Sequence, residues 1–120
     1  MSRAGERRQR QSSNYLAKLA QQNELAFRRE WNKRIRSWLL EIRHRGETLR
    51  AEYDPKVEGE LVFSVLNRAA DLIASCGLRV EKLVGLETRT VLANECCKVV
   101  AGVFGPEMYR VYNYKGYHKR

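Results

Sequence analysis

The sequence predicts a mainly α-helical protein with three principal helices, the first long, basic and amphipathic, and with a small C-terminal strand or hairpin. The first observation is a helical period in residues 27–49, where large apolar residues recur every three or four positions: Phe27, Trp31, Ile35, Trp38 and Ile42. The second is a pair of wide apolar faces with the same period in residues 57–76 and 87–104. The third is the position of the two prolines, 55 and 106, which follow the first and last of these segments.

The first principal helix is expected from Ser13 to Arg50, either continuous or kinked. Three of its glutamates precede an arginine by four residues, and each such pair stabilises a helix by roughly 0.2–0.5 kcal/mol. These pairs are Glu24–Arg28, Glu30–Arg34 and Glu41–Arg45. Asn23 followed by Glu24 is typical of a helix N-cap, so a break near Gln22 would let a second helical segment begin there.

The face of this helix opposite the aromatic stripe is basic. It carries cations with few acidic residues among them, namely Arg29, Lys33, Arg36 and Arg43. Two interpretations are open, because these side chains are either merely solvated or in contact with a polyanion. Leu40 projects from the middle of the same face, either as a contact for a partner or as an ordinary exposed leucine.

The second and third helices are expected over residues 57–76 and 87–104. Gly77 occupies the position where a left-handed residue commonly follows a helix. Gly105-Pro106 stops the third helix. Residues 78–84 between the two helices are expected either as a short strand or as a single helical turn.

Both ends of the chain are basic and flank a helical domain expected over residues 13–108. Residues 1–12 are expected as a disordered basic arm whose candidate phosphate contacts are Arg7, Arg8 and Arg10. Residues 109–120 form a tail in which tyrosines alternate with cations, a composition that suits stacking on unpaired bases. The candidate binding residues of the tail are Arg110, Tyr112, Tyr114, Lys115 and Tyr117. The tail also suits a strand or hairpin over residues 108–117.

Charge is distributed unevenly along the 120 residues, whose net charge is +9. Residues 1–50 hold 13 basic and 5 acidic residues, whereas residues 51–108 hold 6 and 9, and residues 109–120 hold 4 and none. Solubility alone needs no such division. A binding surface built from the two ends of the chain would produce it.

The sequence offers no catalytic or metal-binding constellation, so we expect neither an enzyme nor a cofactor. Neither of the two histidines, His44 and His118, has a sequence neighbour that would make a nucleophile pair. Cys96 and Cys97 are adjacent and cannot form a CxxC clamp for zinc, and Cys76 is a lone third thiol. An odd number of cysteines is best explained by reduced, buried thiols in a cytoplasmic protein.

Two functions remain open from the sequence. The first is a small accessory protein that binds nucleic acid or a nucleoprotein through the arm, the basic helix face and the tail. The alternative is a protein-binding inhibitor or adaptor, of the kind that phages and mobile elements encode, acting on a nucleic-acid-handling enzyme such as a defence nuclease. Leu40 among arginines favours the alternative, because interfaces place apolar anchors inside a charged rim. We expect no membrane partner, and the long helix also permits a homodimer with Trp31 and Trp38 in its seam.

Overall fold

The computed structural model of the protein describes residues 3–51 and 58–106, with side chains described for residues 12–51 and 62–106. The elements in chain order are α1 (Arg3–Gln22), α2 (Glu24–Ala51), α3 (Glu58–Cys76), the short α4 (Leu78–Val80), the π-helical turn η1 (Glu81–Gly85) and α5 (Leu86–Phe104). These residues contain no strand, so the expected mainly α fold is confirmed. The strand or hairpin expected over residues 108–117 lies outside the described residues.

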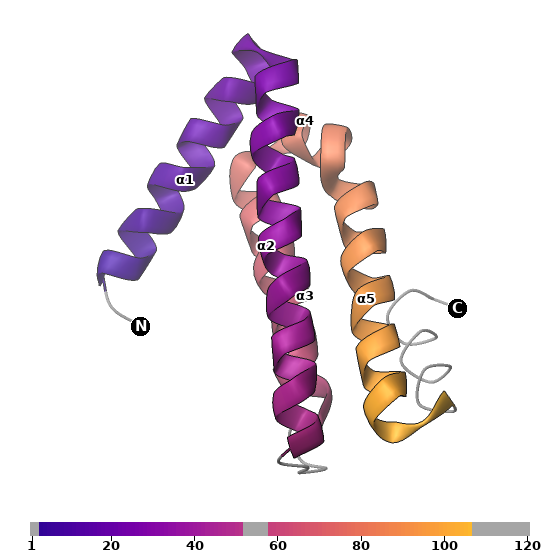
Figure 1. Ribbon diagram of the computed structural model, residues 1–120. Coiled ribbons are helices and arrows are strands. Elements are labelled where there is room, and N and C mark those ends of the chain that lie inside the picture. The colour runs from indigo at the N-terminus through magenta and orange to yellow at the C-terminus, as the bar shows by residue number, and fades with distance from the viewer. Residues whose placement is uncertain (1–2, 52–57, 107–120) are drawn as a thin grey trace.

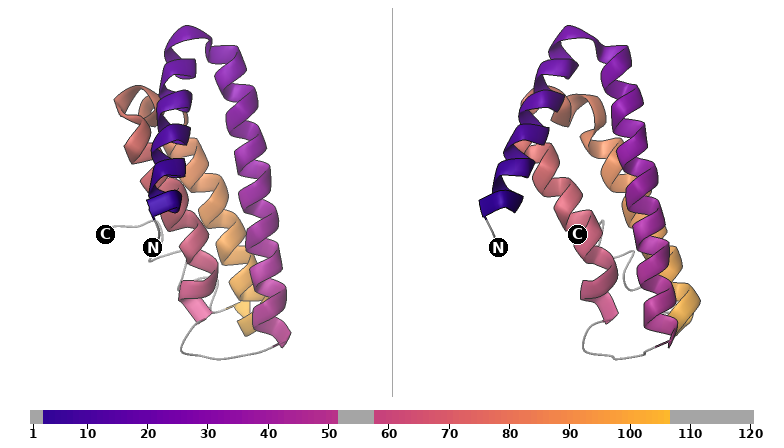
Figure 2. Two further views of the ribbon diagram at one scale, coloured as in Figure 1. Left: turned by 90° about the vertical axis from the view of Figure 1, so that its left-hand side faces the viewer. Right: turned by 60° about the vertical axis from the view of Figure 1, so that its left-hand side comes forward.

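The four long helices of the described part run alternately up and down in the view of Figure 1. α1 and α3 ascend, whereas α2 and α5 descend. α2 and α3 pack against each other, and each of them also packs against α1 and α5. α1 meets α2 at the top and diverges from it toward the N-terminus, as the further views confirm (Figure 2).

The single first helix expected over Ser13–Arg50 is instead two helices joined by a reversal at Asn23. The side-chain Oδ1 of Asn23 accepts a hydrogen bond from the backbone N–H of Ala26 at 3.1 Å, so the expected N-cap is confirmed. The chain reverses because the apolar residues of α1, including Leu16 and Ala20, are fully buried beside the first turns of α2. A straight helix would leave this face of α1 in water.

α1 also begins earlier than expected. Residues 1–12 were expected as a disordered basic arm, but residues 3–12 have a helical backbone that continues without interruption into residues 13–22. The composition of this stretch permits the extension, since arginine, glutamine, glutamate and alanine are all good helix formers.

Two apolar clusters form the core. The upper cluster joins α1, α2, α3 and the α4–η1 turn through Leu16, Ala20, Phe27, Trp31, Leu72, Ile73, Cys76, Val80 and Val84. The lower cluster joins α2, α3 and α5 through Ile42, Leu49, Val62, Val65, Ala69, Leu92, Cys96 and Val100. Trp38 packs against both. The later helices therefore pack on the aromatic stripe as expected. Trp31 is only 1% exposed, so it is not available for the seam of a homodimer.

Residues 78–84 are helical, and the strand alternative is wrong for this segment. The described residues offer no other strand to pair with, so the backbone N–H groups are satisfied locally, as in the bond from Glu81 N to Gly77 O at 3.1 Å. The π-helical turn fits Gly85, because the carboxylate of Glu81 lies where a Cβ of residue 85 would stand. Arg89 holds that carboxylate at 2.7 Å.

Two helical glycines on the facing sides of α2 and α5 are expected to respond in opposite ways to alanine. A Cβ at Gly46 would lie 2.3 Å from Cγ1 of Val99, a stiff β-branched side chain, so we expect Gly46→Ala to cost about 1–3 kcal/mol of unfolding free energy. A Cβ at Gly102 would meet only Nη2 of Arg50 at 3.7 Å. Gly102→Ala should therefore add roughly 0.5–1 kcal/mol through helix propensity. Urea unfolding of both variants measures the difference, and equal effects would contradict the close approach of the two helices.

Candidate nucleic-acid interface

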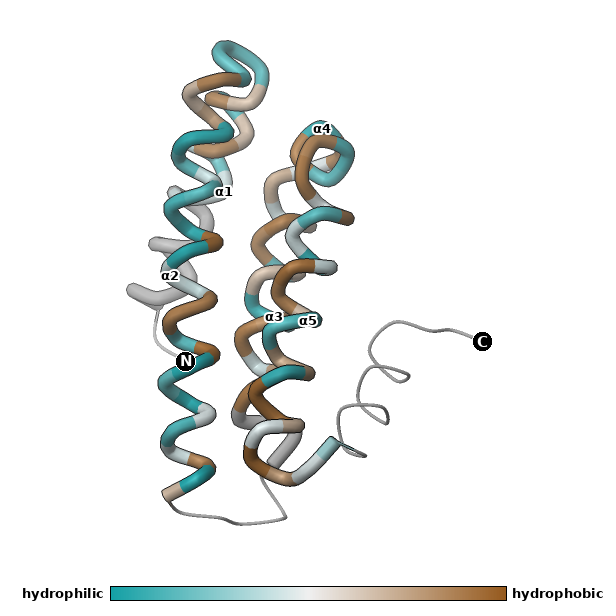
Figure 3. Tube along the Cα trace, turned by 45° about the vertical axis from the view of Figure 1, so that its right-hand side comes forward, coloured by the Kyte–Doolittle hydropathy of each residue, from teal (hydrophilic) through white to brown (hydrophobic). Residues whose placement is uncertain are grey.

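One side of α2 remains uncovered by the rest of the described structure. Figure 3 shows hydrophobic residues on the side of α2 toward α3 and α5 and hydrophilic residues on the other side. The hydrophilic side carries the four cations expected from the sequence, here called the basic face: Arg29, Lys33, Arg36 and Arg43. All four are exposed. They extend over about 21 Å of helix, at about 1.5 Å per residue.

The first three members of the basic face are weakly compensated by acids. Lys33 Nζ lies 4.0 Å from Oε1 of Glu30, at the outer limit of an ion pair. No described residue forms an ion pair or hydrogen bond with Arg29 or Arg36. Exposed cations without acidic partners keep their full field for an approaching anion.

Arg43, the fourth member, is held differently. Its Nε donates to Oε2 of Glu95 on α5 at 2.9 Å, and the Glu95 side chain is only 15% exposed. The Arg43 side chain itself remains 55% exposed. Glu95 therefore orients Arg43 toward α5 and offsets part of its charge.

Leu40 lies exposed on the same side of the helix, as expected. Its side chain is 63% exposed, and it stands one helical turn from Arg36 and from Arg43. An exposed leucine alone is common on protein surfaces. Leu40 is distinguished by its position between two exposed arginines.

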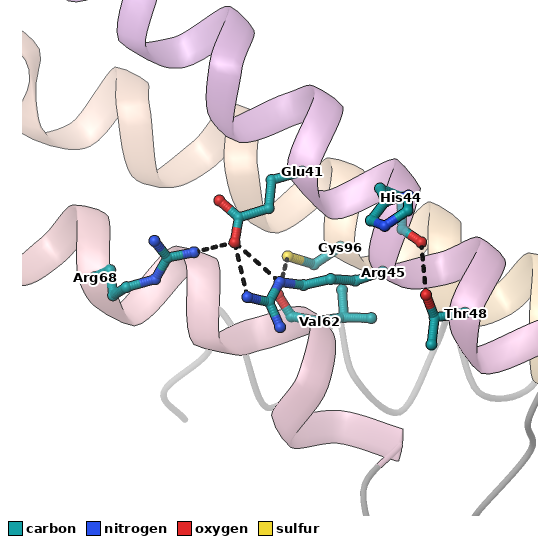
Figure 4. A network of polar contacts seen from close by, with 7 residues as sticks. All are labelled: Glu41, His44, Arg45, Thr48, Val62, Arg68 and Cys96. Atoms are coloured by element: carbon teal, nitrogen blue, oxygen red, sulfur yellow. Dashed lines mark hydrogen bonds and ion pairs between the residues drawn. The ribbon is translucent and has the colours of Figure 1, made fainter.

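Three other arginines of α2, Arg28, Arg34 and Arg45, are partly buried and bound to neighbouring side chains, so they lie outside the basic face. Arg45 and Arg68 both donate to Oε2 of Glu41, which links α2 to α3 (Figure 4). Burial raises the pKa of Glu41, but the hydrogen bonds and charges of these two arginines outweigh it and hold the pKa below its usual value.

Arg34, expected to pair with Glu30, instead donates from Nη2 to Oγ of Ser12 in α1. Arg28 does form the expected pair, 3.5 Å from Glu24.

A hollow between the lower halves of α2 and α5 adjoins the basic face. It measures about 330 Å³ and is lined by Arg43, Gly46, Glu47, Arg50, Lys98, Val99 and Gly102. We call it the α2–α5 groove. Sequence reasoning did not single out Arg50 or Lys98. The available signal was a glycine inside each of two apolar-faced helices, which is typical of close packing.

The remaining candidate residues are not brought to this interface by what the structure describes. Arg7, Arg8 and Arg10 belong to the helical backbone of α1, and their side chains lie outside the described part. The tail residues also lie outside it: Arg110, Tyr112, Tyr114, Lys115 and Tyr117.

The three cysteines are free and buried, as expected. Burial raises the pKa of Cys96 to about 12 and that of Cys76 to about 11, and it also raises the pKa of Cys97. Among the described residues, no group of three metal-binding side chains lies together.

We expect these thiols to resist Ellman's reagent in the folded protein at about pH 8, because the thiolate is the reactive form and burial disfavours it. All three should react once urea unfolds the chain. Because folding raises these thiol pKa values, the free energy of unfolding should be highest below the ordinary thiol pKa and should fall as the pH rises above it. Rapid reaction in the absence of denaturant would contradict the burial of the cysteines.

Comparison of the chain with protein-family models, with curated proteins and with solved structures finds no match. Within residues 3–51 and 58–106, every helix is too short or too polar to cross a lipid bilayer. The fold and the site therefore identify the class of protein only as a helical bundle with an uncovered basic face on α2.

Proposed function

We propose that the protein is a small, non-enzymatic accessory protein that binds nucleic acid or a nucleoprotein through the basic face of α2. The observation that carries this proposal is the exposure of Arg29, Lys33 and Arg36 on one side of α2, with no close acidic partner among the described residues for Arg29 or Arg36. The net charge of +9 supports it, because a basic surface attracts polyanions over long distances. The arm and the tail would add contacts at either end.

Binding of this kind is largely electrostatic. Each phosphate that a lysine or arginine neutralises releases condensed counterions, so affinity falls steeply as salt rises. The basic face offers guanidinium and ammonium groups but little else that could read a base edge. Sequence preference would therefore be weak, unless tyrosines of the tail stack on unpaired bases.

Fluorescence anisotropy with labelled single- and double-stranded DNA and RNA tests the proposal. We expect submicromolar binding at low salt, with log affinity falling by about 0.9 per neutralised duplex phosphate for each tenfold rise in salt. A preference for single strands would assign a role to the tail. Binding that is absent at low salt, or that does not depend on salt, would rule the proposal out.

A protein partner is the second candidate, and Leu40 is the observation that favours it. An apolar anchor that is 63% exposed among cations fits an acidic groove with a central apolar pocket. The partner would be a nucleic-acid-handling enzyme, and the protein would act as its inhibitor or adaptor. Leu40→Ala distinguishes the candidates, because it should leave oligonucleotide affinity unchanged and weaken a protein complex. Buried, reduced thiols fit a cytoplasmic setting for either role.

A further inference from the structure

We infer that the α2–α5 groove, which adjoins the open basic face, is a phosphate-binding site that holds one backbone phosphate of the bound nucleic acid. The inference rests on the proposed function for the source of the phosphate, but not for the chemistry of the groove. The groove lies beside Gly46, where α2 approaches Val99 of α5 so closely that a Cβ on Gly46 would overlap this side chain.

Two glycines shape the groove. Gly46 has no side chain and so lets α5 approach α2, and the exposed Gly102 leaves the backbone of α5 bare beside the hollow. The nearest atom to a Cβ placed on Gly102 is Nη2 of Arg50, at 3.7 Å. The guanidinium of Arg50 therefore extends from α2 toward the bare backbone of α5, and a ligand oxygen can reach it without passing a side chain at position 102.

Three cations converge on this small volume from two helices. Arg43 and Arg50 come from α2, and Lys98 comes from α5. No described residue forms an ion pair with Arg50 or Lys98, whereas Arg43 is offset by Glu95. Glu47 is the one acid of the lining, and its side chain is 74% exposed. Convergent cations repel one another, so an anion that sits between them removes this repulsion and gains charge-assisted hydrogen bonds.

The size of the groove restricts the ligand. A volume of about 330 Å³ lies at the lower end of the roughly 300–1,000 Å³ typical of small-molecule sites. This is room for a phosphate and one attached sugar. Planar guanidinium groups match the paired oxygens of a phosphate, and lysine adds a point charge.

Arg43 makes the groove continuous with the basic face, since it belongs to both. A strand that follows α2 from Arg29 reaches the groove after about 21 Å of helix. The open face would then attract the nucleic acid electrostatically, and the groove would fix the position of one phosphate on the protein.

The test uses the full chain and two probes. Inorganic pyrophosphate is titrated into ¹⁵N-labelled protein and followed by NMR, and a labelled oligonucleotide is followed by anisotropy. We expect saturable shifts at the amides of residues 46, 98 and 102, and scattered weak shifts elsewhere. Arg50→Ala with Lys98→Ala should remove these shifts and reduce the salt slope of oligonucleotide binding by about 1, as expected for the loss of one phosphate contact.

Two further variants separate shape from charge. Gly102→Leu fills the groove and keeps every charge, so it should abolish the pyrophosphate shifts and weaken the oligonucleotide about tenfold, the effect of losing one good contact. Its melting temperature shows that it folds. Glu47→Gln should strengthen pyrophosphate binding about two- to threefold, as expected for one exposed charge, whereas the matched Glu87→Gln at the other end of α5 should not.

The outcomes for the groove and for the proposed function are separable. Oligonucleotide binding that is unchanged in Gly102→Leu and in the Arg50/Lys98 variant overturns the groove and leaves the proposed function standing. Saturable pyrophosphate shifts without oligonucleotide binding overturn the proposed function, and they assign the groove to a small phosphate ligand instead. Pyrophosphate shifts spread evenly over the basic face, or absent at residues 98 and 102, overturn the groove.

Discussion

The double variant Arg29→Glu/Arg36→Glu is expected to lose nucleic-acid binding by roughly a hundredfold or more at about 100 mM salt, because it replaces two phosphate contacts with two repulsive charges. Both arginines are exposed and neither has a described acidic partner, so the substitutions break no ion pair of the described structure. Glutamate is also a good helix former, so α2 should be preserved.

The matched control is Lys18→Glu/Lys82→Glu. Both lysines are exposed, and they lie on α1 and on η1 rather than on α2. The control lowers the net charge by the same amount as the test variant. If the basic face is the binding surface, the control weakens binding several-fold at most, through the overall field. Equal losses in the two variants would show that net charge alone attracts the ligand.

Arg43 is a poor choice for the same experiment, although it belongs to the basic face. Its Nε donates to Glu95 at 2.9 Å, so Arg43→Glu would place two carboxylates against each other at the α2–α5 contact. Loss of binding in that variant would mix a destabilised helix pair with a lost phosphate contact. Arg29 and Arg36 avoid this ambiguity.

Local signals explain why the ends of the later helices could be predicted from the sequence. α3 and α5 each end before a glycine with a positive φ, 98° at Gly77 and 116° at Gly105, a conformation that costs glycine little. The expected ranges 57–76 and 87–104 differ from α3 and α5 by one residue at their starts. The exposure of Arg29 and Arg36 followed in the same way from the helical period of the aromatic stripe.

Features that depend on how helices meet could not be predicted in this way. The cap at Asn23 predicts where a helix begins, but the local sequence does not predict that α1 folds back on α2. The pairing of Arg43 with Glu95 requires the register between α2 and α5, in which Gly46 lies against Val99. The α2–α5 groove depends on the same register. Residues 78–84 were too short a stretch for their apolar period to separate a strand from a helical turn.

A buried hydrogen bond between α2 and α5 gives the second large effect that we expect. Trp31 is 1% exposed, and its Nε1–H donates to Oγ1 of the fully buried Thr88 at 2.7 Å. It also stacks on Phe27 and meets Trp38 edge-on, with ring centroids 5.7 Å apart in each pair. Trp31→Ala should therefore cost about 3–5 kcal/mol of unfolding free energy, a large part of the roughly 5–15 kcal/mol that stabilises most domains.

A double-mutant cycle separates the hydrogen bond from the packing. Thr88→Val keeps the shape and leaves the indole N–H unpaired, so we expect it to cost about 1–3 kcal/mol. Once Trp31→Phe has removed the donor, Thr88→Val should cost little, because both partners are then apolar.

Trp38→Phe is the matched control, since Trp38 packs against both clusters without contacting Thr88 through a hydrogen bond of the described structure. Urea unfolding followed by circular dichroism measures all four corners of each cycle. Additive costs in the Trp31 cycle would mean that α2 and α5 are not joined by this bond, and the register that forms the α2–α5 groove would then lose its upper anchor.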